Sequence, residues 1–147
     1  MFDFFPKIVP DAEHLAHIFS TATAPTFFLG SVAAFASLMT NRMNIAVQRI
    51  QTLNSIADDD PNRAHLKSDL RRLVRRAELL KSGIFASLVA GVCATILLAD
   101  LFVTEFLGLR YAYGAALLFL ISTIFLGIGL VRFAQEVRIS LVDADKF

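Results

Sequence analysis

The sequence predicts an all-α membrane protein that has three transmembrane helices and a cytoplasmic, coiled-coil-like antiparallel helical hairpin between the first and second spans. The chain of 147 residues is 56% hydrophobic and only 18% charged, with a mean hydropathy of +0.61. Soluble domains contain about 25% charged residues. The charged residues are gathered in blocks, and apolar runs with the length of membrane spans lie between them. The longest charged block keeps a helical apolar pattern, which predicts the hairpin.

The first transmembrane helix is expected over residues 18–41, after an external N-terminal segment and amphipathic helix start over residues 1–17. Asp11 is a suitable N-cap for this helix. The apolar run that begins at Pro25 is too short to span a bilayer, so the span is expected to include that proline and to be kinked there. Small hydroxyl residues before Pro25 can satisfy the carbonyl groups that proline leaves free. The N-terminus lacks the pattern of a cleavable signal peptide.

The hairpin is expected over residues 42–82. Its apolar residues recur in steps of three and four, which is the spacing of a coiled-coil seam. One seam comprises Met43, Val47, Ile50, Leu53 and Ala57, and the other comprises Leu66, Leu70, Leu73, Ala77 and Leu80. Asp60 and Pro61 suit the N-cap and first position of the second arm. The two seams are therefore expected to face each other.

Two further transmembrane helices are expected over residues 83–107 and 111–131, followed by a cytoplasmic tail over residues 132–147. Arg132 and Glu136 are one helical turn apart, which is compatible with continuation of the third helix. Twelve of the 14 Lys and Arg residues lie in the hairpin and the tail. The positive-inside rule then places the hairpin and the C-terminus in the cytoplasm and the N-terminus outside.

Composition and motifs argue against several function classes. The formal net charge is +1, and the arginines have no interleaved aromatic residues, so no nucleic-acid partner is expected. The single cysteine, Cys93, permits no disulfide within the chain and no zinc site. Neither a nucleophile elbow, a phosphate-binding loop, a metalloprotease motif nor a C-x-x-C motif is present. We therefore expect a protein that is not an enzyme, with no catalytic residues and no cofactor.

Polar residues near the outer ends of the spans are candidates for a site. His14 and His17 are one turn apart near acidic residues, so a divalent metal site is conceivable, although a bare H-x-x-H lacks the rest of a motif. The plainer interpretation is an interfacial helix. Asp100 is the one acid expected within a span, and Arg110 is its natural partner. Alternatively, Asp100 reaches headgroup water.

Small residues recur along the first and second spans in steps of four. Such residues allow two helix backbones to approach closely. They serve either packing within one subunit or an interface between subunits, and the sequence leaves both interpretations open. The candidates for a helix-packing or oligomer interface are Gly30, Ala34, Gly83, Ser87, Gly91 and Thr95.

A cluster of arginines on the second arm of the hairpin offers three interpretations. It comprises Arg71, Arg72, Arg75 and Arg76. The cluster is a positive-inside anchor, a contact for anionic lipid headgroups or a docking face for an acidic partner. The first interpretation is favoured, because basic residues near the membrane already account for topology.

Three blocks of the sequence resemble a family of small bacterial membrane proteins known as domain of unknown function family 2721. They are TAPTFFLGSVAAFASLMTNRM, LRRLVRRAELLKSGI and LVRFAQEVRISL, and the resemblance covers roughly His14 to Leu141. It implies three membrane helices with a cytoplasmic helical hairpin in a bacterial inner membrane. It implies no activity and no site residues.

The expected function is that of a non-enzymatic integral-membrane protein. It self-assembles or serves as an accessory subunit of a larger membrane complex, so its expected partners are the bilayer, further copies or other subunits, and anionic lipids. The alternative is a homo-oligomeric ion channel with a cytoplasmic helical vestibule. Its pore would use the polar residues Thr21, Thr23 and Ser31.

Overall fold

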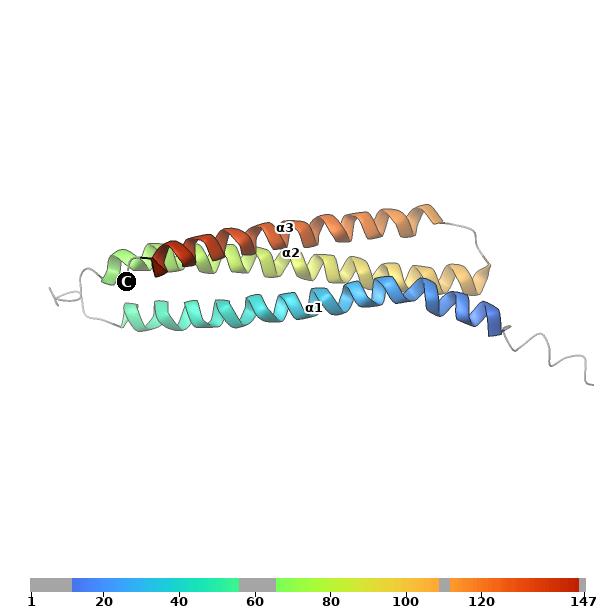
Figure 1. The fold of residues 1–147 in the computed structure, drawn as a ribbon, viewed down its shortest axis with the longest axis horizontal. Coiled ribbons are helices and arrows are strands. Elements are labelled where there is room, and N and C mark those ends of the chain that lie inside the picture. Colours follow the sequence, from blue (N-terminus) through green and yellow to red (C-terminus); the bar gives the residue numbers. More distant parts are fainter. Residues whose placement is uncertain (1–11, 56–65, 109–111, 146–147) are drawn as a thin grey trace, which may run out of the picture.

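The computed structural model describes residues 12–55, 66–108 and 112–145, and these residues form three long helices. They are α1 (Ala12–Asn54), α2 (Leu66–Leu107) and α3 (Ala112–Ala144). Figure 1 shows that successive helices run antiparallel and that α2 lies between α1 and α3. The predicted all-α fold with three apolar helices is thereby confirmed.

Each helix is longer than a bilayer is thick. At about 1.5 Å per residue, the 43 residues of α1 extend about 65 Å, whereas the hydrocarbon core measures about 30 Å. All three helices contain a stretch that is long and apolar enough to cross a membrane. The chain is therefore a multi-pass membrane protein whose helices continue beyond the bilayer.

Charged residues mark one edge of the apolar region, where a Cβ on Gly83, two residues after Lys81, would lie 3.6 Å from Cβ of Arg132. The segment from Tyr113 to Arg132 of α3 rises about 29 Å, and so does the segment from Lys81 to Asp100 of α2. We call the part of the bundle beyond this edge the basic end, and it comprises residues 42–54, 66–81 and 132–145. The basic end contains three helices, because residues 132–144, expected as a tail, continue α3 without interruption.

An apolar seam with coiled-coil spacing follows α1 through both parts of the bundle. Its residues alternate in steps of three and four, and none of them is exposed. They are Ala22, Pro25, Leu29, Val32, Ala36, Met39, Met43, Ala46, Ile50 and Leu53. The sequence predicts Met43, Ile50 and Leu53 of this inner seam but places Val47, which is half-buried, where the structure buries Ala46. The turn expected around Asp58–Asn62 lies outside the described residues.

Pro25 lies inside α1 and is buried there, and the helix continues through it. Its missing N–H leaves the carbonyl of Thr21 without its helical donor. The hydroxyl of Thr26 donates to the neighbouring carbonyl of Ala22 at 2.7 Å. Figure 1 shows the N-terminal turns of α1 inclined to the rest of the helix.

Small residues allow α2 and α3 to approach closely. A Cβ atom on Gly129 would lie 2.9 Å from Oγ of Ser87 and 3.2 Å from the carbonyl oxygen of Gly83. Further along the same contact, the buried hydroxyl of Ser122 donates to the carbonyl oxygen of Ala90 at 2.6 Å. The close contact of these two helices therefore depends on glycine and serine.

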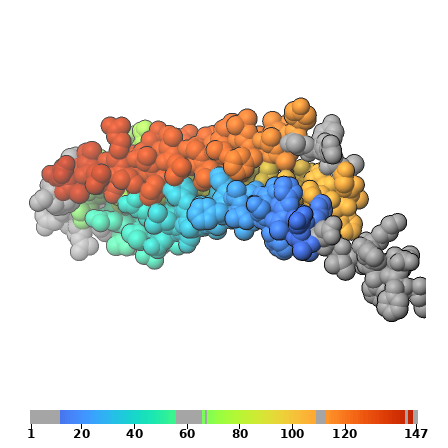
Figure 2. Space-filling model, turned by 45° about the vertical axis from the view of Figure 1, so that its right-hand side comes forward, coloured from blue at the N-terminus to red at the C-terminus, as the bar shows by residue number. Residues whose placement is uncertain are grey.

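Aromatic side chains fill the wider space between α1 and α3. Phe28 and Phe119 lie with ring centroids 5.7 Å apart, and Phe35 and Phe133 meet edge to face at 5.4 Å. Figure 2 shows the two helices lying along each other on one face of an elongated body. Long side chains thus connect α1 and α3, whose backbones stay farther apart than those of α2 and either neighbour.

Candidate functional site

A buried acidic residue connects all three helices at the start of the basic end. Glu136 of α3 has no exposed surface. Arg76 of α2 donates to its Oε1 through Nε at 3.0 Å and through Nη2 at 2.9 Å. Nη1 of Arg42, on α1, lies 3.3 Å from Oε2. One residue from each helix therefore contributes to this ionic contact.

Neighbouring side chains complete the contact, which we call the Glu136 cluster. Nη2 of Arg76 also donates to Oγ of Ser140 at 3.3 Å, one turn along α3. The guanidinium of Arg42 lies over the ring of Phe133, 5.4 Å from its centroid. The Glu136 cluster comprises Arg42, Arg76, Phe133, Glu136 and Ser140.

The two carboxylate oxygens of Glu136 have different surroundings. Oε1 accepts both hydrogen bonds from Arg76, whereas the buried Oε2 accepts no hydrogen bond from a described residue and lies in ion-pair contact with Arg42. A buried carboxylate is costly unless charges of opposite sign surround it. The cluster therefore favours one rotation and one axial position of the three helices, those that bring both arginines to Glu136.

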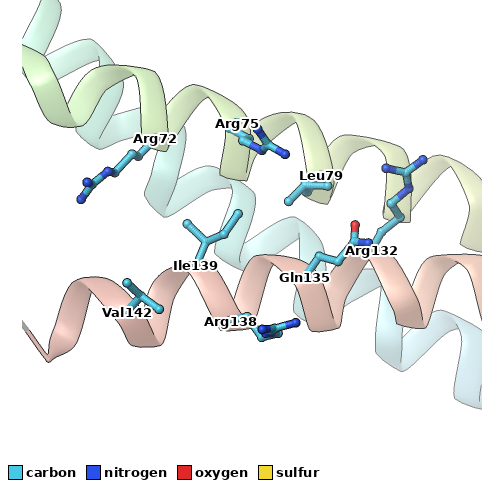
Figure 3. Close-up of a pocket in the computed structure, with 8 residues that line it drawn as sticks. All are labelled: Arg72, Arg75, Leu79, Arg132, Gln135, Arg138, Ile139 and Val142. Atoms are coloured by element: carbon cyan, nitrogen blue, oxygen red, sulfur yellow. The ribbon is translucent and has the colours of Figure 1, made fainter.

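A second group of arginines lines an open groove between α2 and α3 at the same end. The groove has a volume of about 750 Å³. Its lining, drawn in Figure 3, consists of Arg72, Arg75, Leu79, Arg132, Gln135, Arg138, Ile139 and Val142. We call it the arginine groove. Its described lining includes four arginines and no acidic residue, so it is chemically suited to an anion.

The predicted arginine cluster is divided between these two environments. Arg72 and Arg75 line the arginine groove, whereas Arg76 points to Glu136 and is only 20% exposed. Arg71 is exposed and lines neither. One face of α2 thus contributes Arg72 and Arg75 to the arginine groove, and the adjacent face contributes Arg76 to the contact with Glu136.

Some of the predicted small-residue positions lie in contacts between helices of the chain, and others are exposed. Gly83 and Ser87 are buried against α3, and Gly91 has side chains of α1 within 4 Å of its ideal Cβ position. Thr95 is exposed, and its hydroxyl donates to the carbonyl of Gly91 at 2.9 Å. Gly30 and Ala34 are exposed on α1, with no described atom within 4 Å of a Cβ on Gly30.

The hydroxyl groups expected to line a pore are exposed on α1 and bond within that helix. Thr21, Thr23 and Ser31 each donate to the carbonyl four residues earlier, at 2.9, 2.8 and 3.0 Å. Thr21 and Thr23 differ by about 200° around the helix axis. These three residues therefore do not form one narrow polar stripe.

The polar residues at the opposite end include one contact between a histidine and an acid. Nε2 of His14 lies 3.5 Å from Oε1 of Glu105, and His17 is exposed. Within the described part of the chain, no three His, Cys, Asp or Glu residues form a group that could hold a metal ion. Asp100 is half-buried, with Oδ2 3.8 Å from a Cβ placed on Gly114. Arg110, its expected partner, lies outside the described residues.

The sequence reasoning did not select Glu136 as a site residue, nor Arg42, Arg132 and Arg138. A signal for Glu136 is present, because Ser122, Gly129 and Glu136 are spaced seven residues apart. All three are buried on the face of α3 that meets α2. An acidic residue at the buried position of a repeat requires cationic partners on the neighbouring helices.

The chain belongs to the family described as protein of unknown function (DUF2721), whose sequence pattern matches residues 22–145. The matched region includes every member of the Glu136 cluster and the whole lining of the arginine groove. The predicted family resemblance is thereby confirmed. No curated protein and no solved structure matches the chain.

Proposed function

We propose that the protein is a non-enzymatic structural component of the membrane that assembles with further copies of itself through the outward face of α1. The observation that supports this most directly is a second seam on α1, opposite the buried one. Its residues again alternate in steps of four and three, and all are exposed. They are Thr23, Phe27, Gly30, Ala34, Ser37, Asn41, Asn44, Gln48, Gln51 and Ser55. We call them the outer seam.

The chemistry of the outer seam changes with depth but includes no charge. Within the apolar region it carries small residues such as Gly30, Ala34 and Ser37, which allow close approach of a second helix. At the basic end it carries side-chain amides, beginning with Asn41 and Asn44. A helix face that only meets water usually carries charged residues. Amides at seam positions are instead typical of coiled coils, where they specify the register.

A second copy suits this face better than a different chain. Copies in one membrane share their orientation, so two α1 helices related by a twofold axis run parallel with equal residues at equal depth. Each Asn or Gln would then meet its own counterpart, and an amide both donates and accepts hydrogen bonds. Gly30 would meet Gly30 of the partner at the narrowest point. The face is therefore self-complementary.

The exposed face of α3 provides a contrast within the same molecule. It carries large aliphatic residues such as Leu117, Leu120 and Ile124, which are 59%, 57% and 53% exposed. Such side chains suit contact with lipid chains, since they need no polar partner. The difference favours lipid around α3 and protein against α1. An accessory role in a larger complex would use the same α1 face with a non-identical helix.

Cysteine cross-linking in native membranes tests the assembly. In a Cys93→Ala background, we expect Ser37→Cys to form a disulfide-linked dimer on mild oxidation. The matched control is Leu38→Cys, the next residue, which is 49% exposed but about 100° away around α1. Equal cross-linking of the two variants, or none for Ser37→Cys, would contradict the proposed face.

A substitution at Gly30 provides the second readout. Gly30→Leu has space within one copy, since no described atom lies within 4 Å of the added Cβ. We expect the variant to keep its helical content and to lose most of the Ser37→Cys cross-link. A cross-link of undiminished yield would show that the helices do not meet at this glycine.

The pore alternative requires α1 to line an open axis rather than to close against another α1. The hydroxyls of Thr21, Thr23 and Ser31 already donate to their own helix, which leaves only their oxygen lone pairs for an ion. We expect no ion current from the cross-linked assembly in planar bilayers. A current that Thr23→Leu abolishes would instead support a pore.

A further inference from the structure

We propose that the arginine groove binds the phosphate headgroup of an anionic phospholipid, with one acyl chain lying along the adjoining face of α3. The inference does not depend on assembly through α1, because the groove is formed by α2 and α3 of one copy. It assigns a ligand class to arginines that the Glu136 cluster does not use.

The first support is the charge of the groove. Arg75, Arg132 and Arg138 form no ion pair with any described residue. Arg75 and Arg132 extend from α2 and α3 on either side of Leu79, and Arg138 lies at the outer edge of α3 (Figure 3). Guanidinium groups from two helices are therefore available to phosphate oxygens, which they bind through charge-assisted hydrogen bonds.

No acid among the described residues pairs with Arg75, Arg132 or Arg138. Glu136, the nearest buried acid, is enclosed between Arg42 and Arg76 and has no exposed surface. Glu78 is exposed on α2 but does not line the groove. Glu136 therefore pairs with Arg42 and Arg76, and Arg75, Arg132 and Arg138 of the groove have no acidic partner among the described residues.

The second support is the depth of the groove. Arg132 directly follows the apolar span of α3, and Arg138 lies about 9 Å farther along the helix. On α2, Arg75 lies about 9 Å beyond Lys81 in the same direction. The polar layer of a bilayer occupies about 5–8 Å on each side of the hydrocarbon core. The arginines therefore extend through and just beyond the layer that contains lipid phosphates.

The third support is an apolar groove that begins at the same residues. It has a volume of about 510 Å³ and is lined by Ile124, Gly127, Ile128, Val131, Arg132 and Gln135. Arg132 and Gln135 line both grooves. No described atom lies within 4 Å of a Cβ on Gly127, so the space beside this glycine is open. A headgroup in the first groove would therefore continue into an acyl chain in the second.

This continuity favours a lipid over a soluble phosphate or an acidic peptide. Inorganic phosphate would use the arginines alone and would gain nothing from Gly127 and Ile128. An acidic peptide would lie outside the bilayer and would not reach the apolar groove. A diacyl phospholipid meets both grooves with one molecule, since its phosphate and its chain are joined at the membrane surface.

Native mass spectrometry of the detergent-purified protein tests the inference, with phosphatidylglycerol as the probe. The test variant combines Arg75→Gln, Arg132→Gln and Arg138→Gln. The control combines Arg49→Gln, Arg71→Gln and Lys81→Gln, which removes the same charge from exposed positions outside the groove. We expect the test variant to lose affinity for phosphatidylglycerol by about tenfold or more, and the control by less than about threefold. Equal losses in the two variants would overturn the specific site.

Further ligands and one uncharged variant distinguish the source of the phosphate. Gly127→Leu fills the apolar groove without changing charge, and we expect it to weaken phosphatidylglycerol binding while leaving glycerol 3-phosphate binding unchanged. Phosphatidylcholine should bind at least about tenfold more weakly than phosphatidylglycerol, because its headgroup has no net charge. Tighter binding of a Glu-rich peptide than of phosphatidylglycerol would overturn the lipid assignment. The lipid assignment would also be overturned if Gly127→Leu bound phosphatidylglycerol and glycerol 3-phosphate as tightly as the unchanged protein does.

Discussion

Two sets of arginines at the basic end occupy opposite environments although they lie at similar depth. Arg76 is 20% exposed and bonded to Glu136, whereas its sequence neighbour Arg75 is exposed and lines an open groove. Neighbouring helix residues differ by about 100° around the axis, so one points between the helices and the other outward. The environment of a basic residue here depends on whether its side of the helix faces the buried Glu136.

The comparison also explains why the two sets should respond differently to substitution. Removing an arginine from the Glu136 cluster leaves a carboxylate in a place without water. Removing Arg75, Arg132 or Arg138 from the groove leaves no acid unpaired, because none of the three pairs with a described acid. The expected loss in the free energy of unfolding, measured in mixed detergent micelles, is therefore larger for the Glu136 cluster than for the groove.

Arg76→Leu should have the largest effect. It removes both hydrogen bonds to Oε1 and leaves Glu136 with only the 3.3 Å contact to Arg42. Breaking a buried ion pair from one side costs about 3–5 kcal/mol. The loss is measured by following helical circular dichroism as denaturing detergent is added. A loss below about 1 kcal/mol would mean that the carboxylate gains water or a proton at little cost.

Glu136→Gln should have a smaller effect than Arg76→Leu, about 1.5–3 kcal/mol. It leaves two guanidinium groups without their anion, but the side chains of Arg42 and Arg76 are 32% and 20% exposed and can turn toward water. The same titration measures the difference between the two variants. If Glu136→Gln lowered the free energy of unfolding more than Arg76→Leu, the arginines rather than the carboxylate would be the charges that folding leaves without solvation.

The double variant Arg76→Leu with Glu136→Leu sharpens this comparison. Replacing both partners of a buried pair by apolar residues is often neutral or stabilising, whereas removing one partner is not. We expect the double variant to be more stable than Arg76→Leu alone. If the loss of unfolding free energy in the double variant equalled the sum of the losses in the two single variants, Arg76 and Glu136 would not be coupled.

Arg42→Leu should cost less again, about 1 kcal/mol. Its guanidinium lies near Oε2 without a hydrogen bond, and its contact with the Phe133 ring is partly exposed. Glu136 retains both bonds from Arg76. Unfolding in the same micelles checks the value, and a loss as large as that of Arg76→Leu would show that Oε2 depends on Arg42 more than the geometry indicates.

Arg75→Gln should have the smallest effect, within about 0.5 kcal/mol of the unchanged protein in lipid-free micelles. The side chain forms no ion pair with a described residue, and its removal reduces repulsion among the groove arginines. A clear destabilisation without lipid would assign Arg75 to folding rather than to binding.

Most of the fold could be predicted from sequence because it depends on local patterns. Apolar runs of spanning length fix the three helices, and the steps of three and four from Met43 onward predict part of the buried seam of α1. The same spacing at Pro25, Val32 and Met39 extends that seam into the membrane. The sequence does not reveal this membrane part of the seam. Nearly every residue of a membrane span is apolar, so buried and lipid-facing residues have the same composition.

The candidate site could be predicted only in part. The arginines of α2 stand out as a cluster, but their division between Glu136 and the groove requires the rotation of α2 relative to α3. The other half of the groove comes from Arg132 and Arg138, more than fifty residues away along the chain. Likewise, the small residues of α1 and α2 look equivalent in sequence, although Gly83 meets α3 and Gly30 meets nothing in the described chain.

The sequence by itself determined the number of helices, their apolar and basic ends and the family, because hydropathy and charge are properties of short segments. Only the tertiary structure decided which arginines are bonded to Glu136 and which face of α1 is left uncovered. The physical reason is that pairing across helices depends on the rotation and axial position of three rods. Those are set jointly by the Gly83–Gly129 approach, the aromatic contacts and the Glu136 cluster.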